Sequence, residues 1–456
     1  MDRRNLILQA GAALAIGGNA YAQPKTGPTV PIGKRPICRT RPNIASLTQA
    51  QLTALKAGVS TMMSRSASDP TSWSYQAAMH ATYTTPTKLL WNGCQHGTQH
   101  FLSWHRLFLY YFERILRQAS GSSSLMLPFW NWTAARAMPT PFTDSTPGNP
   151  LFTTQRGPGI NGGSLLPTSA VAIATPMADV PFNDFSSDLE ATPHGAVHVA
   201  IGGWMGQIPT AAQDPIFWLH HCNIDRLWEV WLAKGGGRAD PTSASWTGQT
   251  FSFFDETGTE RTVAVSKGLN TCRGLGYQYP AGLKFPLWPF PLIVQLSDLR
   301  AGGVPAPPSN AAVRAELGSR PFELKLPVPQ AAKAAGAHLY LAFDDISVDN
   351  TDGYYEIYIN PPVGKTPDSS DPSYAGNLVL FGLSEKELAV RHAGMDMNMP
   401  PARRVYDVTP KLPQLRAVKG FDSTALRVVL VLRTTEGAKP QEGVRAHIGR
   451  VQLIAK

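Results

Sequence analysis

Histidines crowd into a short part of this chain. Eight of the 11 histidines among the 456 residues lie between His80 and His221. They form two groups, which are His80, His96, His100 and His105, and then His194, His198, His220 and His221. The i, i+4 spacing of His194 and His198 places both on one face of a helix, and Pro193 suits the first turn of such a helix. Imidazole ligands favour copper or zinc over magnesium or calcium, so the two groups predict two metal ions of that kind.

The stretch from His96 to Glu113 reads HGTQHFLSWHRLFLYYFE. From Trp104 onward its aromatic residues recur at three- and four-residue intervals, which predicts a buried amphipathic helix with His105 on the same stripe. His96 lies nine residues earlier, about half a turn out of phase at roughly 100° per residue. Both histidines can therefore reach one ion only if the chain bends between them, as Gly97 permits. The alternative is a buried aromatic helix with hydrogen-bonded histidines, and the further histidines at ligand spacing argue against it.

Two long motifs carry a resemblance to a known family. The first joins His96 to the run FLSWHR, which ends at Arg106, with Glu113 downstream. The second, from Asp214 to Asp225, reads DPIFWLHHCNID. In this order they resemble the signatures of the type 3 copper proteins, the family of tyrosinases, catechol oxidases and hemocyanins. The likeness covers roughly residues 36–280 and is to an exported, bacterial member of that family.

The resemblance implies a set of metal ligands. Two copper ions are expected, copper A held by His80, His96 and His105 and copper B held by His194, His198 and His221. His80 lies 16 residues before His96, about where the family has its third copper A ligand. His100 is the alternative ligand for copper A in the first group, but the family pattern has no ligand at its position. His220 and His221 point about 100° apart on a helix, so only one should bind readily, and the motif favours His221.

Four other positions match functional positions of the family. Cys94, two residues before His96, stands where fungal and molluscan members form a thioether to the imidazole; the alternative is a buried free thiol. Glu190 resembles the acid that holds a water near copper B and assists phenol deprotonation, with a solvated glutamate as the alternative. Gly195 stands where tyrosinases often have asparagine, which favours catechol oxidase. Ile208 matches the gate phenylalanine above copper A in plant enzymes, and its smaller side chain predicts a more open entrance.

The N-terminus has the layout of a cleaved signal peptide. Residues 1–24 read MDRRNLILQAGAALAIGGNAYAQP, with two arginines, a short apolar segment and an Ala-Tyr-Ala site that ends at Ala22. The paired arginines resemble a Tat signal, with a Sec signal as the alternative. We therefore expect residues 1–22 to be removed and the protein to be exported, either to the periplasm or out of the cell. No other stretch is apolar and long enough to cross a membrane, so no membrane partner is expected.

Length and pattern predict two domains. The resemblance implies that residues 23–280 form a mainly α catalytic domain, a four-helix bundle around a dicopper centre with long irregular loops. A Pro- and Gly-rich linker is expected over 281–325, and short alternating strands predict a C-terminal β-sandwich over 326–456. The net charge of +9 could suggest nucleic acid, but no basic run or nucleic-acid motif accompanies it, so no nucleic-acid partner is expected.

The four cysteines suggest one disulfide pairing. Cys94 is already assigned to the thioether and Cys222 lies inside the second motif, which leaves Cys38 and Cys272. An exported protein can keep a disulfide, and a bond between these two would join the start of the catalytic domain to its end. Other pairings of four cysteines stay open.

The resemblance implies an oxidase. A small phenolic substrate and dioxygen would be the partners, with o-diphenols oxidised to o-quinones and monophenols hydroxylated more slowly. A true tyrosinase is the main alternative. A hemocyanin-like oxygen carrier is a second, and a single chain with an export signal argues against it. A di-zinc hydrolase comes last, because such sites usually need carboxylate ligands.

Overall fold

The computed structural model describes residues 38–280 and nine later stretches of one compact unit, residues 35–456. These stretches are 313–334, 337–349, 353–364, 366–384, 387, 402–413, 422–435, 442–443 and 445–455. The predicted signal peptide, residues 1–22, lies outside the described residues. The same holds for residues 281–312, the larger part of the predicted linker.

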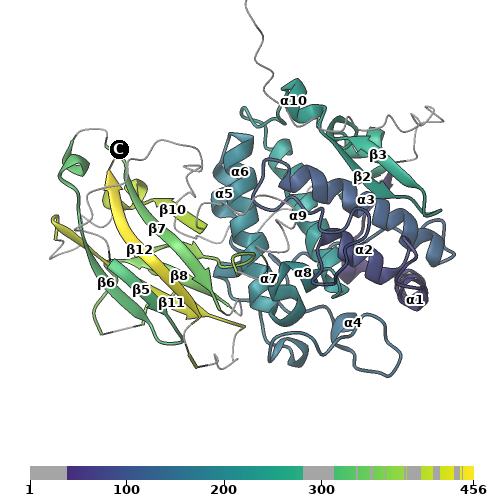
Figure 1. Ribbon diagram of the computed structural model, residues 1–456, viewed down its shortest axis with the longest axis horizontal. Helices are drawn as coiled ribbons and strands as arrows, with labels where there is room; N and C mark the ends of the chain where they lie inside the picture. Colours follow the sequence, from purple (N-terminus) through teal and green to yellow (C-terminus); the bar gives the residue numbers. More distant parts are fainter. Residues whose placement is uncertain are drawn as a thin grey trace, which may run out of the picture. The chain divides into compact units, whose positions relative to one another are not determined.

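Helices fill the region up to residue 247 (Figure 1). They are α1 Gln49–Ser64, α2 Trp73–His80, α3 Phe101–Ala119, α4 Thr140–Thr143, α5 Ala174–Ala178, α6 Phe182–Leu189, α7 Ala196–Ile201, α8 Ile208–Ala211, α9 Ile216–Ala233 and α10 Ala244–Thr247. Local sequence explains several starts: Thr48 and Gln51 form a reciprocal capping box at α1, and the Ser72 side chain accepts from the Tyr75 N–H at α2. The helix predicted around His105 is α3, so that prediction is confirmed.

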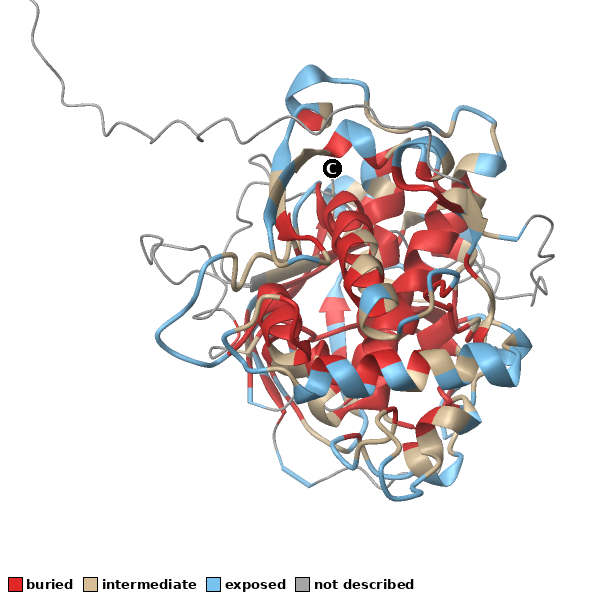
Figure 2. Cartoon of the chain, turned by 90° about the vertical axis from the view of Figure 1, so that its right-hand side faces the viewer, coloured by how far each residue is buried: buried red, intermediate tan, exposed pale blue. Residues whose placement is uncertain are grey.

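The long helices α3 and α9 pack together at the centre of the helical region. Both are buried along most of their length, and Figure 2 shows such buried helices with exposed segments around them. The rings of Phe112 and Trp218 stack between the two helices with centroids 3.3 Å apart, and Trp73 of α2 meets both edge-on. Large aromatic rings contribute much buried area, so this contact fixes how α3 and α9 cross.

Charged side chains tie the ends of the helical region to its core. Asp225 of α9 accepts hydrogen bonds from Arg106 of α3 at 2.5 Å and from the hydroxyls of Tyr277 and Tyr279 at 2.6 Å each. Arg41 lies over the Tyr277 ring and bonds Glu113 at 2.9 Å. Because these buried charges are paired and hydrogen-bonded, they can remain ionised inside the protein.

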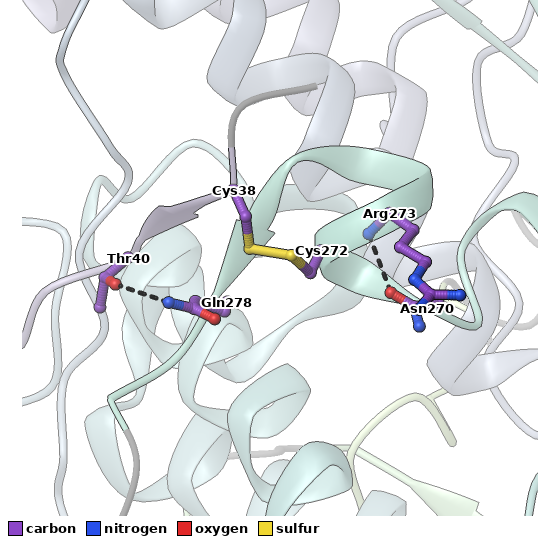
Figure 3. Close-up of a disulfide and its surroundings, with 6 residues drawn as sticks. All are labelled: Cys38, Thr40, Asn270, Cys272, Arg273 and Gln278. Atoms are coloured by element: carbon purple, nitrogen blue, oxygen red, sulfur yellow. Dashed lines mark hydrogen bonds between the residues drawn. A yellow bond between two sulfur atoms is a disulfide. The ribbon is translucent and has the colours of Figure 1, made fainter. Parts of the chain in front are cut away.

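A disulfide joins the two chain segments that lead to Arg41 and Tyr277. Cys38 and Cys272 are bonded, as Figure 3 shows, so this pairing is confirmed. Beside it β1 (Arg39–Thr40) pairs in parallel with β4 (Tyr277–Gln278), and the Gln278 amide donates to the Thr40 hydroxyl at 3.3 Å. A separate hairpin is formed by β2 (Thr250–Phe254) and β3 (Glu260–Ala264).

The later residues form two antiparallel four-stranded sheets. One has the order β10-β7-β12-β5 and the other β6-β11-β8-β9. Their strands are β5 Val313–Leu317, β6 Phe322–Pro327, β7 Leu339–Val348, β8 Tyr354–Ile359, β9 Tyr374–Leu378, β10 Ala402–Asp407, β11 Ala425–Arg433 and β12 Ala446–Ala455. Apolar residues of both sheets belong to one hydrophobic core. β5 and most of β6 lie inside the predicted linker 281–325, so the strand region begins earlier than the sequence pattern indicated.

Hydrogen bonds join the strand region to the helical region. The hydroxyls of Tyr354 and Ser169 lie 2.5 Å apart, and the Asn377 amide donates to the Ser169 carbonyl at 3.0 Å. The Gly353 N–H donates to the Val199 carbonyl of α7 at 3.2 Å. The strand region therefore contacts the part of the chain that carries the second histidine group.

Candidate metal centre

The six histidines predicted as ligands come from different parts of the helical region. They are His80 at the end of α2, His96 in the loop before α3, His105 in α3, His194 in the turn Glu190–Gly195, His198 in α7 and His221 in α9. Gly97 has φ of 70°, a left-handed conformation that suits glycine, and it supplies the predicted bend after His96. Thr192 leaves the helical conformation directly before Pro193, so the helix carrying His194 and His198 begins at this proline, as predicted.

The six rings form one buried cluster. None of them is more than 3% exposed. His96 and His105 approach to 4.9 Å between centroids despite their different phases. Between the two groups, His105 and His221 stack at 4.5 Å with 14° between their planes. The two histidine groups therefore share one interior site.

Backbone carbonyls orient four of the six imidazoles through Nδ1. The contacts are His80 to Ile208 O at 3.1 Å, His105 to Phe101 O at 2.8 Å, His194 to Glu190 O at 3.0 Å and His198 to Met205 O at 2.8 Å. A carbonyl oxygen can only accept, so we assign the proton to Nδ1 in each ring. The lone pair of Nε2 then faces the interior, which is the arrangement found for metal-binding histidines.

The Nε2 atoms face one another. The two Nε2 atoms of His80 and His96 lie 3.0 Å apart, and those of His198 and His221 lie 3.2 Å apart. Nε2 of His105 and of His194 has no hydrogen-bond partner among the described residues. Inward-facing lone pairs without protons are unfavourable in a dry interior, and bound cations would satisfy them. The donor set therefore fits metal ions.

Burial also keeps four of the six rings neutral. It lowers the pKa of His105 to about 3 and the pKa values of His194, His198 and His221 well below the ordinary range. Neutral imidazole is the form that binds metal. No proton has to leave these rings near pH 7 before an ion can enter.

The tyrosinase family model, described as the common central domain of tyrosinase, matches residues 70–183 and 169–234. A tyrosinase from Hahella sp. is 30% identical, and the alignment covers 91% of this chain and 99% of that protein. This chain belongs to the tyrosinase family. As a type 3 copper protein, it is a copper oxidoreductase with two copper ions, and its two histidine groups can bind them.

Other relatives extend the likeness along the chain. A chloroplastic polyphenol oxidase of Malus domestica is 27% identical over 61% of this chain and 60% of its own length. Two solved structures share the fold: a latent aurone synthase (TM-score 0.66, 20% identity, 95% of this chain and 93% of that one) and a latent apple tyrosinase (TM-score 0.63, 22% identity, 93% and 99%). Residues 308–456 match a domain of unknown function, DUF7868. In the described residues, every helix is too short or too polar to cross a membrane.

Two further histidines of this tyrosinase-family chain, His220 and His100, make contacts with other side chains. The indole N–H of Trp132 donates to Nδ1 of His220 at 3.2 Å, which leaves the ring proton of neutral His220 on Nε2. His220 can therefore not offer an Nε2 lone pair to copper in this state, although it lies within the second group. His100 stacks on Trp246 at 5.4 Å, and its Nδ1 faces the Ser103 hydroxyl at 3.2 Å.

Cys94 lies beside the first histidine group. A ligand atom of Cys94 lies within 4.8 Å of nitrogen atoms of His80 and His96. Its backbone N–H donates to the His80 carbonyl at 3.3 Å, so the loop is held against the end of α2. The predicted thioether partner, His96, is thus one of its two histidine neighbours.

Glu190 reaches both halves of the metal centre. Its Oε1 accepts from the Gly97 N–H at 2.6 Å and lies 3.5 Å from Nδ1 of His96, while its carbonyl orients His194. Gly195 lies one turn later. A Cβ atom there would be 3.0 Å from Val379 Cγ1, so a larger residue must displace that side chain.

Ile208 is a buried residue whose backbone serves the site. Its side chain is 1% exposed, and its carbonyl accepts from Nδ1 of His80. Its N–H donates to the carboxylate of Glu387 at 2.7 Å. Sequence reasoning singled out the side chain at this position and missed both backbone contacts.

Phe381 covers one side of the centre. Its ring stacks on that of His198 at 4.4 Å with 15° between the planes, and it lies 5.7 Å from His194 and 5.8 Å from His96. Sequence reasoning missed this residue because it lies in an apolar run, Leu378–Phe381, that is typical of a strand. An aromatic ring from the C-terminal region thus lies against histidines of both groups.

Proposed function

We propose that this chain is a catechol oxidase, which oxidises o-diphenols to o-quinones with dioxygen and hydroxylates monophenols more slowly. The observation that carries the proposal is Gly195. With no side chain at this position, residue 195 supplies no side-chain amide that could help Glu190 to bind a water for the phenolic proton. A catechol loses its proton more easily at two coppers than a monophenol does, so it needs that help less.

For the ligands we propose His80, His96 and His105 at copper A and His194, His198 and His221 at copper B. The inward Nε2 atoms described above support this set. His220 is excluded because Trp132 donates to its Nδ1. When bound, the copper pair supplies the chemistry that passes two electrons from a phenolic ring to dioxygen.

The protein residues orient and shield this chemistry. Carbonyl contacts at Nδ1 hold the imidazoles in place, and the burial of all six rings keeps bulk water out. Glu190 is proposed to hold the water that takes the phenolic proton, since its side chain keeps 16% exposure beside the buried His96. The hydrogen bond that its carboxylate accepts from the Gly97 N–H fixes where that water would be held.

The first test compares two substrates. Oxygen uptake by the copper-loaded protein should be fast with catechol and slow, with a lag phase, with tyrosine. A wild type that hydroxylates tyrosine as fast as it oxidises catechol would contradict the proposal, and copper-loaded protein that turns over neither would favour an oxygen carrier.

We expect Gly195→Asn to raise the ratio of monophenolase to diphenolase activity. Because the new side chain meets Val379, the variant is best made with Val379→Ala and compared with Val379→Ala alone. The ratio should rise by up to about tenfold, less than the roughly 10²- to 10⁴-fold that general acid–base catalysis contributes. Glu190→Gln should lower the rate on tyrosine more than the rate on catechol. If both variants changed the two rates equally, preference would depend on pocket access instead.

We also propose a thioether between Cys94 and His96, supported by their proximity. The peptide containing both residues should then be lighter by two hydrogens than its sequence mass, measured by mass spectrometry. Cys94 should also resist alkylation after reduction. Cys222, the other cysteine outside the disulfide, is the matched control and should alkylate once the protein is unfolded. An alkylatable Cys94 in active, copper-loaded protein would rule the crosslink out.

Several structural assignments belong to the same proposal. We infer that the helices carrying the histidines form a four-helix bundle and that the two later sheets form a β-sandwich, since they share one core. Residues 1–22 are proposed as a removed export signal and 23–280 as the catalytic domain. The sandwich domain is proposed to start with β5, earlier than residue 326. Phe381 is proposed to act as a lid that keeps phenols from copper B.

A further inference from the structure

Glu387 is a fully buried carboxylate at the edge of the helical region. It is 0% exposed. One oxygen accepts from the Ile208 N–H at 2.7 Å, and the other accepts from the Ser384 hydroxyl at 2.6 Å. Burying a carboxylate is costly unless donors surround it, and these two contacts supply donors to both oxygens. A residue of the C-terminal region therefore reaches the backbone of α8.

The start of α8 needs such a partner. The first N–H groups of a helix have no acceptor within the helix. Gln207, at the cap position, makes no capping hydrogen bond, and its side-chain oxygen instead accepts from the Tyr83 hydroxyl at 3.1 Å. Pro209 has no N–H to satisfy. The first N–H of α8, that of the buried Ile208, thus depends on Glu387 as its acceptor.

Ile208 connects Glu387 to the metal centre. Its carbonyl is the acceptor for Nδ1 of His80 at 3.1 Å, and Nε2 of the same ring lies 3.0 Å from Nε2 of His96. Partners that orient a metal-binding histidine from its second nitrogen affect metal affinity strongly. In this protein that partner is itself held on its other side by Glu387.

We propose that Glu387 is a positioning residue for copper A, which holds Ile208 in place and through it the ring of His80. The proposal rests on the proposed ligand role of His80. It makes the C-terminal region part of the support of one copper ion, in addition to the cover that Phe381 places over the other side of the centre.

The test measures copper affinity of the full-length apoprotein by competition with a chelator of known affinity. His198→Ala should leave copper A as the remaining site, and His80→Ala should leave copper B. Adding Glu387→Ala is expected to lower the affinity of the remaining site for copper about tenfold in the first background. This is the lower end of the roughly 10- to 100-fold that residues hydrogen-bonded to metal ligands contribute. It should leave copper affinity unchanged in the second background. Equal effects in both backgrounds, or none in either, would overturn the proposal.

Three further variants separate positioning from general stability. Glu387→Gln keeps an oxygen for Ile208 and should retain copper A affinity, whereas Glu387→Asp is one methylene shorter and should weaken it. This pair decides the question even if Glu387→Ala fails to fold, and equal affinities would contradict the role. Tyr354→Phe breaks a different contact between the two regions, the one to Ser169, and should leave both coppers unaffected. If it weakened copper A as much as Glu387→Ala, domain attachment would be the cause and the proposal would be wrong.

Failure of the ligand assignment would look different. In that case His80→Ala and His198→Ala would not each leave a single copper site, whatever residue stands at 387. If each does leave one site and Glu387 variants do not distinguish them, only the positioning role of Glu387 fails.

Discussion

Replacing His221 with alanine is expected to remove one of the two copper ions and to lower catechol oxidation by more than the roughly 10- to 100-fold that losing a supporting residue costs. The reason is that its Nε2 lies 3.2 Å from that of His198, inside the cluster of lone pairs. Copper content by metal analysis and oxygen uptake with catechol would measure both effects.

His220 offers a closely matched control. It is the adjacent residue of the same helix, it is equally buried, and burial lowers its pKa as well. Because Trp132 donates to its Nδ1, His220→Ala should keep two copper ions and most of the activity. The reverse result, in which His220→Ala loses copper and His221→Ala retains it, would show that the tautomer argument assigns the wrong ring.

Replacing Phe381 with alanine is expected to raise the rate of catechol oxidation by about tenfold or more at low substrate, with copper content unchanged. The Phe381 ring stacks on that of His198 at 4.4 Å, and in the proposed lid role a phenol has to displace it to reach copper B. Burial of an aromatic side chain is worth about 1.5–3 kcal/mol, and about 1.4 kcal/mol corresponds to a tenfold change in binding. Removing the ring should therefore appear mainly as a lower KM.

A loss of stability in Phe381→Ala has to be distinguished from the loss of the ring that covers the site. Phe343 of β7 is buried in the core of the two sheets, away from the histidines. Phe343→Leu should lower the thermal stability without raising the rate. Phe381→Leu should give a smaller gain than Phe381→Ala, because leucine still covers part of the site. An unchanged KM in Phe381→Ala would mean that the ring does not obstruct the substrate and that its role is packing alone.

The copper-binding elements could be predicted from sequence because their information is local. His105 shares a helical stripe with its aromatic neighbours, and His194 and His198 are one turn apart, so periodicity alone places them. The pairing of Cys38 with Cys272 could likewise be predicted, since Cys94 was assigned to the thioether and Cys222 lies in the second metal motif.

The contacts made by the C-terminal region could not be predicted in this way. Glu387 lies 179 residues from Ile208, and neither residue has a pattern that refers to the other. Phe381 looks like any apolar strand residue until the fold brings it to His198. The role of Trp132 depends on which nitrogen it contacts, which no spacing rule encodes.

The disulfide makes a covalent ring of the chain between Cys38 and Cys272, which are 234 residues apart. All six proposed ligands lie inside this ring, while Phe381 and Glu387 lie outside it. In the chain-entropy description, closing so large a loop disfavours the unfolded state by about 5 kcal/mol. A single backbone cut within the ring would leave the two pieces tethered, so both histidine groups would stay in one molecule. A cut after the ring would instead separate the copper-binding histidines from the residues proposed to cover and support them.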